Sequence, residues 1–126
     1  MKKILIVIAD YYEDISSSLL KSAKYKLNNF SIKVIKVPGV FEIPVTISKN
    51  IKKYDAFIAL GCVIKGETPH FDFISSASTQ AIMNLSIESK KPIGNGIITC
   101  LNMKQAKARG KKGKEAAKAV ISVLSQ

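Results

Sequence analysis

The residues best suited to chemistry in this chain lie in one short segment, from Gly61 to Asp72. The segment follows an apolar run and contains His70, the only histidine in the sequence. An unperturbed imidazole titrates near about pH 6.5, so His70 can accept and donate protons at neutral pH. Glycines and a proline in the segment leave backbone N–H groups free near the start of the next helix, where anions are stabilised. The segment therefore predicts proton transfer beside a bound anion such as phosphate.

A structural role is the simpler interpretation of each of these residues taken alone. A single histidine at a helix start is more often a capping or surface residue than a catalyst. Asp72 can equally cap the same helix, and glycine-rich turns between strand and helix are common in α/β proteins that bind nothing there. The functional interpretation gains weight only if other unusual segments meet at the same place.

Apolar runs alternate with amphipathic stretches along the whole chain, which predicts strands alternating with helices. The expected strands cover Ile4 to Ala9, Ile32 to Val37, Tyr54 to Leu60 and Ile93 to Cys100, with a bend or a close backbone approach at Gly94-Asn95-Gly96 in the last. The expected helices run from Ser16 to Leu27, Pro44 to Ile51, Phe71 to Glu88 and Met103 to Ala108, and, after a break from Gly110 to Gly113, through Ala116 to Leu124. This order favours parallel pairing through right-handed crossovers. The predicted fold is α/β, a three-layer α/β/α sandwich with a four-stranded, mainly parallel, flavodoxin-like sheet.

Ligands bind at the carboxyl ends of the strands in such sheets. Each unusual segment of the chain follows a strand: Asp10-Tyr11-Tyr12, Pro38 to Pro44, Gly61 to Asp72, and Thr99 onward. We therefore expect all four segments to meet at one edge of the sheet.

Length and composition predict a single folded domain over residues 1–126, with 47% hydrophobic and 23% charged residues. The apolar run from Ile4 to Ala9 lacks a cleavage pattern and is interpreted as a strand, not a signal peptide. No run approaches the roughly 18 apolar residues that cross a bilayer, so we expect a soluble protein without membrane contact. Cys62 and Cys100 have no metal-binding spacing, so reduced thiols, a cytoplasmic location and no metal site are expected.

The formal net charge of +11 raises the possibility of nucleic-acid binding. Of the 20 basic residues only Arg109 is arginine, and the lysines are spread along the helices with one cluster from Lys104 to Lys118. Neither arginines nor aromatic residues form a group of their own. Because nucleic-acid-binding proteins usually combine these groups, we expect no nucleic-acid partner.

Two segments, Val37 to Pro44 and Gly61 to Asp72, together resemble the lumazine synthase family. The resemblance covers nearly the whole chain, because Ile93 to Thr99, Gln105 to Arg109 and Lys112 to Ala117 also match. That family condenses 5-amino-6-(D-ribitylamino)uracil with 3,4-dihydroxy-2-butanone 4-phosphate. The products are 6,7-dimethyl-8-ribityllumazine, phosphate and water, in the penultimate step of riboflavin biosynthesis. The resemblance implies a transferase without cofactor or metal, acting on two small molecules, one of them phosphorylated.

The resemblance also implies roles for individual residues. His70 matches the residue of proton transfer, and Tyr11 stands where the family has an aromatic ring that stacks on the pyrimidine. Substrate contacts are implied for Val40, Phe41 and Glu42 at the ribityl chain, Cys62, Val63 and Ile64 at the pyrimidine, Glu67 and Thr68 at the phosphate-binding step, Asn95, and Arg109 as the phosphate-binding arginine. A homo-oligomer follows, a pentamer or an assembly of pentamers, with Asn95 and Arg109 supplied across the subunit interface.

The chain departs from the family pattern at two places. The connection from Arg109 to Lys112 is short, which leaves Lys112 as a secondary phosphate candidate, and Asp10-Tyr11-Tyr12 replaces the common Arg-Phe-Asn. Both departures keep open a relative that binds lumazine or flavin without catalysis. A second alternative, a basic nucleic-acid-binding α/β domain, stays open because of the net charge.

Overall fold

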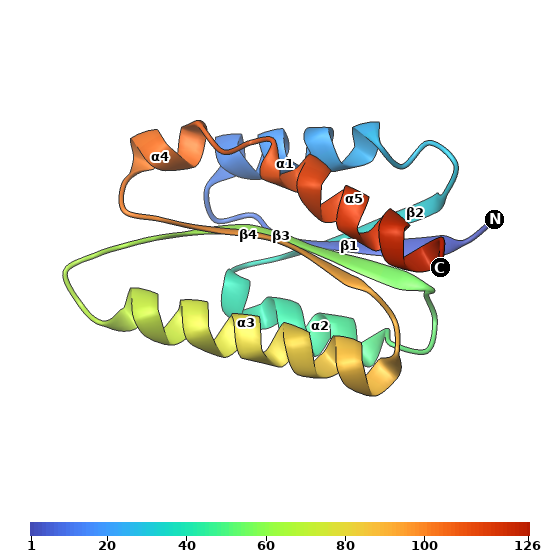
Figure 1. Ribbon diagram of the computed structural model, residues 1–126. Coiled ribbons are helices and arrows are strands. Elements are labelled where there is room, and N and C mark those ends of the chain that lie inside the picture. The colour runs from blue at the N-terminus through green and yellow to red at the C-terminus, as the bar shows by residue number, and fades with distance from the viewer.

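The computed structural model describes all residues from 1 to 126 and has an α/β fold of three layers (Figure 1). The central sheet contains β1 (Lys3–Ala9), β2 (Ser31–Val37), β3 (Ala56–Ile64) and β4 (Ile93–Cys100). All neighbouring strands are parallel and the order is β2-β1-β3-β4. The predicted α/β sandwich with a four-stranded parallel sheet is confirmed.

Helices cover both faces of the sheet, because each connection between parallel strands must cross over one face. The first layer contains α1 (Glu13–Tyr25), α4 (Met103–Lys107) and α5 (Lys112–Leu124). The second contains the short 3-10 helix η1 (Val40–Glu42), α2 (Ile43–Lys49) and α3 (His70–Ser89). The two layers lie on opposite sides of the strands in Figure 1.

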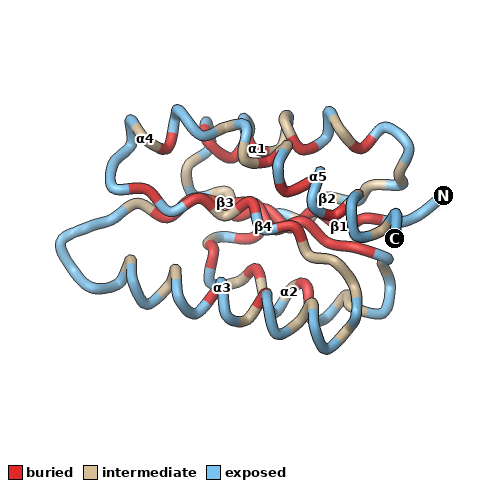
Figure 2. Tube along the Cα trace, viewed as in Figure 1, coloured by how far each residue is buried: buried red, intermediate tan, exposed pale blue.

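The core consists of two apolar clusters, one on each face of the sheet. Strand β1 contributes to both, since Ile4, Ile6 and Ile8 pack toward α1 and α5 while Leu5 and Val7 pack toward α2 and α3. Strands β1 and β3 are buried along nearly their whole length (Figure 2). Burial on both faces explains why these segments are continuous apolar runs in the sequence and show no alternation.

Strand β3 is longer than the sequence predicts, and Gly61 does not end it. The strand continues through Gly61 to Ile64, so the following turn covers only residues 65 to 69 and holds one glycine. A Cβ added at Gly61 would lie 2.9 Å from Cγ2 of Val40 and 3.2 Å from Cβ of Ala9. Gly61 is therefore required for the close approach of η1 to β3.

Two further expectations about helix ends and glycines are corrected. The first helix begins at Glu13, three residues before the predicted Ser16, and its acidic first turn suits the positive end of the helix dipole. Gly113 lies inside α5 and does not break the chain. In β4, Gly94 marks a close approach, because a Cβ there would collide with the backbone oxygen of Ala116 in α5. No helix is long and apolar enough to cross a membrane.

Candidate active site

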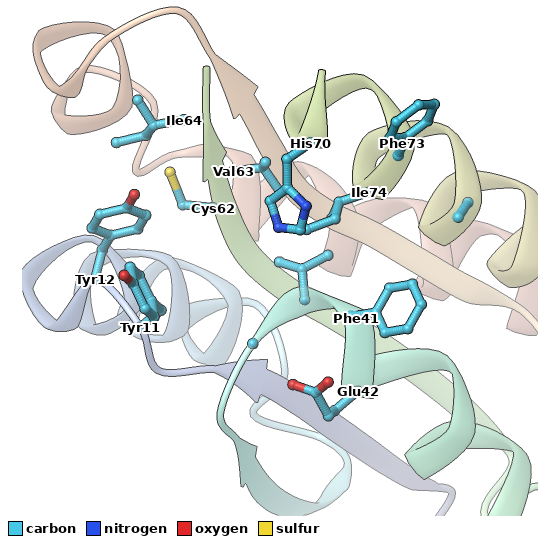
Figure 3. A pocket seen from close by; sticks show the side chains of 13 residues that line it. Tyr11, Tyr12, Phe41, Glu42, Cys62, Val63, Ile64, His70, Phe73 and Ile74 are labelled. Atoms are coloured by element: carbon cyan, nitrogen blue, oxygen red, sulfur yellow. The ribbon is translucent and has the colours of Figure 1, made fainter. Parts of the chain in front are cut away.

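A pocket of about 750 Å³ opens at the carboxyl ends of β1, β2 and β3 (Figure 3). Four segments line it. They contribute Tyr11 and Tyr12 after β1, Gly39, Val40, Phe41 and Glu42 after β2, Cys62, Val63 and Ile64 at the end of β3, and His70, Phe73, Ile74 and Ala77 from α3. The position agrees with the general rule that ligands bind at the carboxyl ends of strands in parallel sheets.

Strand register and local hydrogen bonds hold the first two segments in place. Ala9 pairs with Val37, so β1 and β2 end side by side, and the N–H of Asp10 donates to the carbonyl of Val37 at 3.0 Å. The buried hydroxyl of Ser16 donates to the carbonyl of Ala9 at 2.8 Å and ties α1 to the end of β1. The segment that carries Tyr11 and Tyr12 is thereby fixed at both ends.

The end of β3 presents free backbone groups to the pocket. β1 pairs with β3 only as far as Leu60, whereas β3 runs on to Ile64. The opposite edge of the same segment stays paired with β4, where Val63 aligns with Thr99. Along Cys62 to Ile64, the edge that faced β1 has no strand neighbour, so its N–H and C=O groups can bind a polar ring.

His70 is the first residue of α3, and its imidazole points into the pocket beside Ile74 (Figure 3). Its backbone N–H has Thr68 Oγ1 as acceptor at 3.4 Å, while its ring nitrogens have no hydrogen-bond partner in the chain. The ring is therefore free to exchange protons with a ligand. Glu67 and Thr68 lie in the exposed turn before α3 and do not line the pocket.

Two tyrosines form the aromatic side of the pocket. The rings of Tyr11 and Tyr12 meet edge to face, with centroids 4.9 Å apart, and Tyr11 is 73% exposed. An exposed aromatic face beside free backbone groups suits a flat heterocycle. Burial raises the pKa of Tyr12, with smaller contributions from Tyr11 and Cys62, so its phenol stays protonated at neutral pH.

Cys62 lines the pocket as a neutral thiol. Burial raises the pKa of its thiol to about 12, with the charge and hydrogen bond of Cys100 as smaller causes. A thiol in this state is a poor nucleophile and a poor metal ligand. Cys62 therefore offers shape and its backbone groups to a ligand, and covalent catalysis by its sulfur is disfavoured.

Asn95 and Arg109 lie outside this pocket in the same chain. They line a second cavity of about 660 Å³ beside β4, together with Thr79, Ile97, Ile98, Thr99, Ala108, Lys111, Lys112 and Glu115. Nη1 of Arg109 donates to the carbonyl of Thr99 at 3.3 Å, and Oδ1 of Asn95 accepts from the N–H of Ile97 at 3.0 Å. The chain thus holds its proton-transfer candidate and its only arginine in separate cavities.

The sequence places Tyr12 and Gly39 at this edge only as members of their segments, with no role of their own. It gives no signal that was used to name Phe73, Ile74 or Ala77 of α3 as pocket residues. In the structure Ser78 and Ile82 are the buried residues of α3. Residues three, four and seven positions after His70 share its face of a helix, and this spacing is the signal that finds them.

The fold and the pocket define an α/β protein with a cavity at the carboxyl ends of its parallel strands. A family model described as 6,7-dimethyl-8-ribityllumazine synthase matches residues 1–126. The chain is 43% identical to 6,7-dimethyl-8-ribityllumazine synthase 1 of Rhodopseudomonas palustris, over 97% of this chain and 83% of that protein. It is 42% identical to the 6,7-dimethyl-8-ribityllumazine synthases of Nitrobacter hamburgensis (95% and 82% covered) and Agrobacterium fabrum (96% and 91% covered). The chain belongs to the 6,7-dimethyl-8-ribityllumazine synthase family of enzymes, which confirms the resemblance.

Proposed function

We propose that this protein condenses 5-amino-6-(D-ribitylamino)uracil with 3,4-dihydroxy-2-butanone 4-phosphate to form 6,7-dimethyl-8-ribityllumazine, the penultimate step of riboflavin biosynthesis. The observation that carries the proposal is the pocket itself. In a member of this family, a free imidazole faces an aromatic ring and an unpaired strand edge across a cavity large enough for a small heterocycle. An aromatic face and free backbone groups suit a flat polar heterocycle, and the imidazole suits the proton transfers by which a lumazine ring is formed.

The lining suggests how the uracil substrate binds. The face of Tyr11 stacks on the pyrimidine, while the backbone of Cys62 to Ile64 exchanges hydrogen bonds with the ring amides. The ribityl chain lies along Val40 to Glu42, where the Glu42 carboxylate accepts hydrogen bonds from its hydroxyls. This orientation leaves the reactive amines toward His70.

Each step of the reaction requires the transfer of a proton. The 5-amino group attacks the ketone and water leaves, giving an imine. The imine then loses phosphate by elimination. Elimination leaves an enol, which tautomerises to a second ketone. The ribityl-bearing amine closes the second ring on that carbonyl with loss of another water. His70 acts as acid and then as base, for which about 10²- to 10⁴-fold acceleration is typical. Holding the two reactants together in one pocket supplies much of the remaining rate acceleration.

The phosphate requires a cation that the first pocket lacks, and Arg109 of a second copy is our candidate. Asn95 and Arg109 line an open cavity at the sheet edge, where a neighbouring chain can reach them. The solvent face of α3 supports such contact, because α3 contains no lysine or arginine and exposes Phe73, Met83 and Ile87. The only charged residues of α3 are Asp72 and Glu88, near its two ends, and an exposed apolar surface with so few charges is typical of subunit interfaces. We therefore propose a homo-oligomer, a pentamer or an assembly of pentamers, with sites between neighbours.

The proposal is tested by mixing purified protein with the two substrates and following lumazine absorbance and fluorescence. We expect product above the uncatalysed background, a fall of about 10²-fold or more in kcat for His70→Asn, and a raised KM for the phosphorylated substrate in Arg109→Ala. A folded wild-type protein that binds the product but forms none would reject the enzyme in favour of a binding-only relative.

A further inference from the structure

Positive charge is unevenly divided between the two helical layers. From Met103 to Lys118 the chain has six lysines, one arginine and a single acidic residue, Glu115. This segment and α1 form one layer, whereas α3 on the opposite layer contains no lysine or arginine in its 20 positions (Figure 1). The layer of α1, α4 and α5 is therefore a basic face, on the other side of the sheet from α3 and its His70.

A groove of about 480 Å³ crosses this basic face between α1 and the chain around Gly110. Four lysines from separate segments line it, together with Tyr25 and small residues: Ser18, Lys21 and Ser22 of α1, Lys107 of α4, Ala108, Gly110 and Lys111 of the connection, and Lys114 of α5. No acidic residue lines the groove. Residues distant in sequence thus form one concave surface whose charged groups are all positive.

Hydrogen bonds hold the walls of the groove together. The hydroxyl of Ser22 donates to the carbonyl of Gly110 at 2.7 Å and accepts from the N–H of Lys114 at 3.0 Å. Gly113 lies so close to the backbone oxygen of Leu19 that no side chain would fit there. The backbone positions that carry the lysines are therefore fixed relative to one another.

The lysines of the groove form no ion pair within the chain. The single ion pair of the structure joins Lys36 to Asp10 at 3.8 Å, on another part of the surface. Clustered like charges repel, and an anion that bound among them would relieve the repulsion. The charge of the groove therefore favours a polyanionic ligand.

Tyr25 adds an aromatic surface to this groove. Its side chain is 71% exposed, and the ammonium groups of Lys26 and Lys114 lie 5.8 and 5.9 Å from its ring centroid. Cation–π contact extends to about 6 Å, so both lysines are near its limit and the ring remains accessible. Tyr25 stands between Lys24 and Lys26 in the sequence, and the fold adds Lys21, Lys107, Lys111 and Lys114 to the same surface.

We propose that the groove and Tyr25 bind single-stranded nucleic acid without sequence preference. Lysines neutralise the phosphates and the tyrosine ring stacks on one base, the combination that single-strand binding surfaces use. Lysine acts as a point charge, and the single arginine of the chain lines the other cavity, so no bidentate reading of bases is built into the groove. This activity is independent of lumazine formation.

The test measures anisotropy of a fluorescent oligoadenylate of about 15 nucleotides, an adequate length for one such surface. Wild type is compared with the triple variant Lys21→Gln, Lys107→Gln, Lys114→Gln. We expect the slope of log affinity against log salt to become shallower by about 2, because each phosphate contact contributes about 0.7. The matched control is Lys49→Gln, Lys52→Gln, Lys53→Gln, which removes equal charge from exposed positions at and beyond the end of α2 and should change the slope far less.

A second comparison isolates the stacking contact. Tyr25→Leu should weaken binding of the oligoadenylate about tenfold, in line with about 1–3 kcal/mol per stacked base. The same variant should leave binding of an abasic phosphodiester of equal length unchanged. The proposal would be overturned if the two triple lysine variants reduced the salt slope equally. It would also be overturned if inorganic pyrophosphate or polyglutamate, at equal charge concentration, displaced the oligoadenylate probe. Absence of binding at about 50 mM salt would also refute it.

Discussion

At the scale of single residues, the sequence predicts which side chains line the pocket better than it predicts the surroundings of each side chain. The only histidine of the sequence does line the largest cavity described, and so do Tyr11, Phe41 and Cys62. Their surroundings depend on atoms brought from elsewhere in the chain. The burial that raises the pKa of Cys62 and the edge-to-face contact of Tyr11 with Tyr12 follow from packing, which local sequence does not encode.

Tyr11 should contribute its ring and not its hydroxyl to substrate binding. Tyr11→Phe keeps the exposed aromatic face and should leave KM for the uracil substrate within about twofold, whereas Tyr11→Leu should raise it about 10- to 100-fold. The difference reflects about 1–3 kcal/mol of stacking on a base-like ring. Steady-state kinetics of lumazine formation measure both values. Equal KM increases in the two variants would assign the role to the hydroxyl instead.

The neutral thiol of Cys62 should make stability depend on pH at the alkaline end. Its folded pKa of about 12 lies above the ordinary thiol value of about 8.5, so the folded state binds the proton more tightly than the unfolded state. The resulting stabilisation is present below about pH 8.5 and is lost as the pH rises toward 12. Urea unfolding should show Cys62→Ala less stable than wild type at about pH 7.5, with a smaller gap at about pH 10.5. A gap independent of pH would contradict this assignment.

At the scale of elements, the sequence predicts which segments are strands and helices but not where close packing moves their ends. Apolar runs locate all four strands, and helical spacing locates α1, α3 and α5. A glycine is ambiguous in sequence, because it is compatible with a turn and with a close approach. Gly61 and Gly113 both suggested breaks, and in the structure each lies inside an element that touches another backbone or side chain.

Replacement of Gly61 should therefore separate η1 from β3. In Gly61→Ala the new Cβ would meet Val40 and Ala9, and such overpacking costs about 1–3 kcal/mol of the free energy of unfolding. Gly66→Ala is the matched control, since a Cβ at Gly66 meets nothing within 4 Å, and it should change stability by no more than about 0.5 kcal/mol. Urea unfolding of wild type and the two variants measures these free energies. If both variants were as stable as wild type, Gly61 would not be needed for the close approach of η1 to β3.

At the scale of the whole molecule, the order of strands places the first three unusual segments around one pocket. The fourth is different, because Asn95 and Arg109 lie at the β4 edge, in a cavity that shares no residue with the pocket of His70. The position of an edge strand follows from the strand order, but the sequence of one chain contains no direct signal of what covers that edge. The proposed site between subunits is therefore tested by an experiment on assembled oligomers.

Mixed oligomers provide that experiment. Activity is measured with both substrates well below the raised KM values of Arg109→Ala and Tyr11→Leu, where each variant alone is slow. If His70 of one chain and Arg109 of its neighbour form each site, joint refolding of His70→Asn and Arg109→Ala subunits in equal amounts should restore about a quarter of wild-type activity, because one interface in four pairs two intact halves. His70→Asn mixed with Tyr11→Leu is the control. Both changes fall in the same pocket of one chain, so no mixed interface is intact and the activity should not rise above that of the two variants measured separately. No recovery in the first mixture would place the phosphate site within a single chain, whereas recovery in the control would mean that His70 and Tyr11 of one site come from different chains.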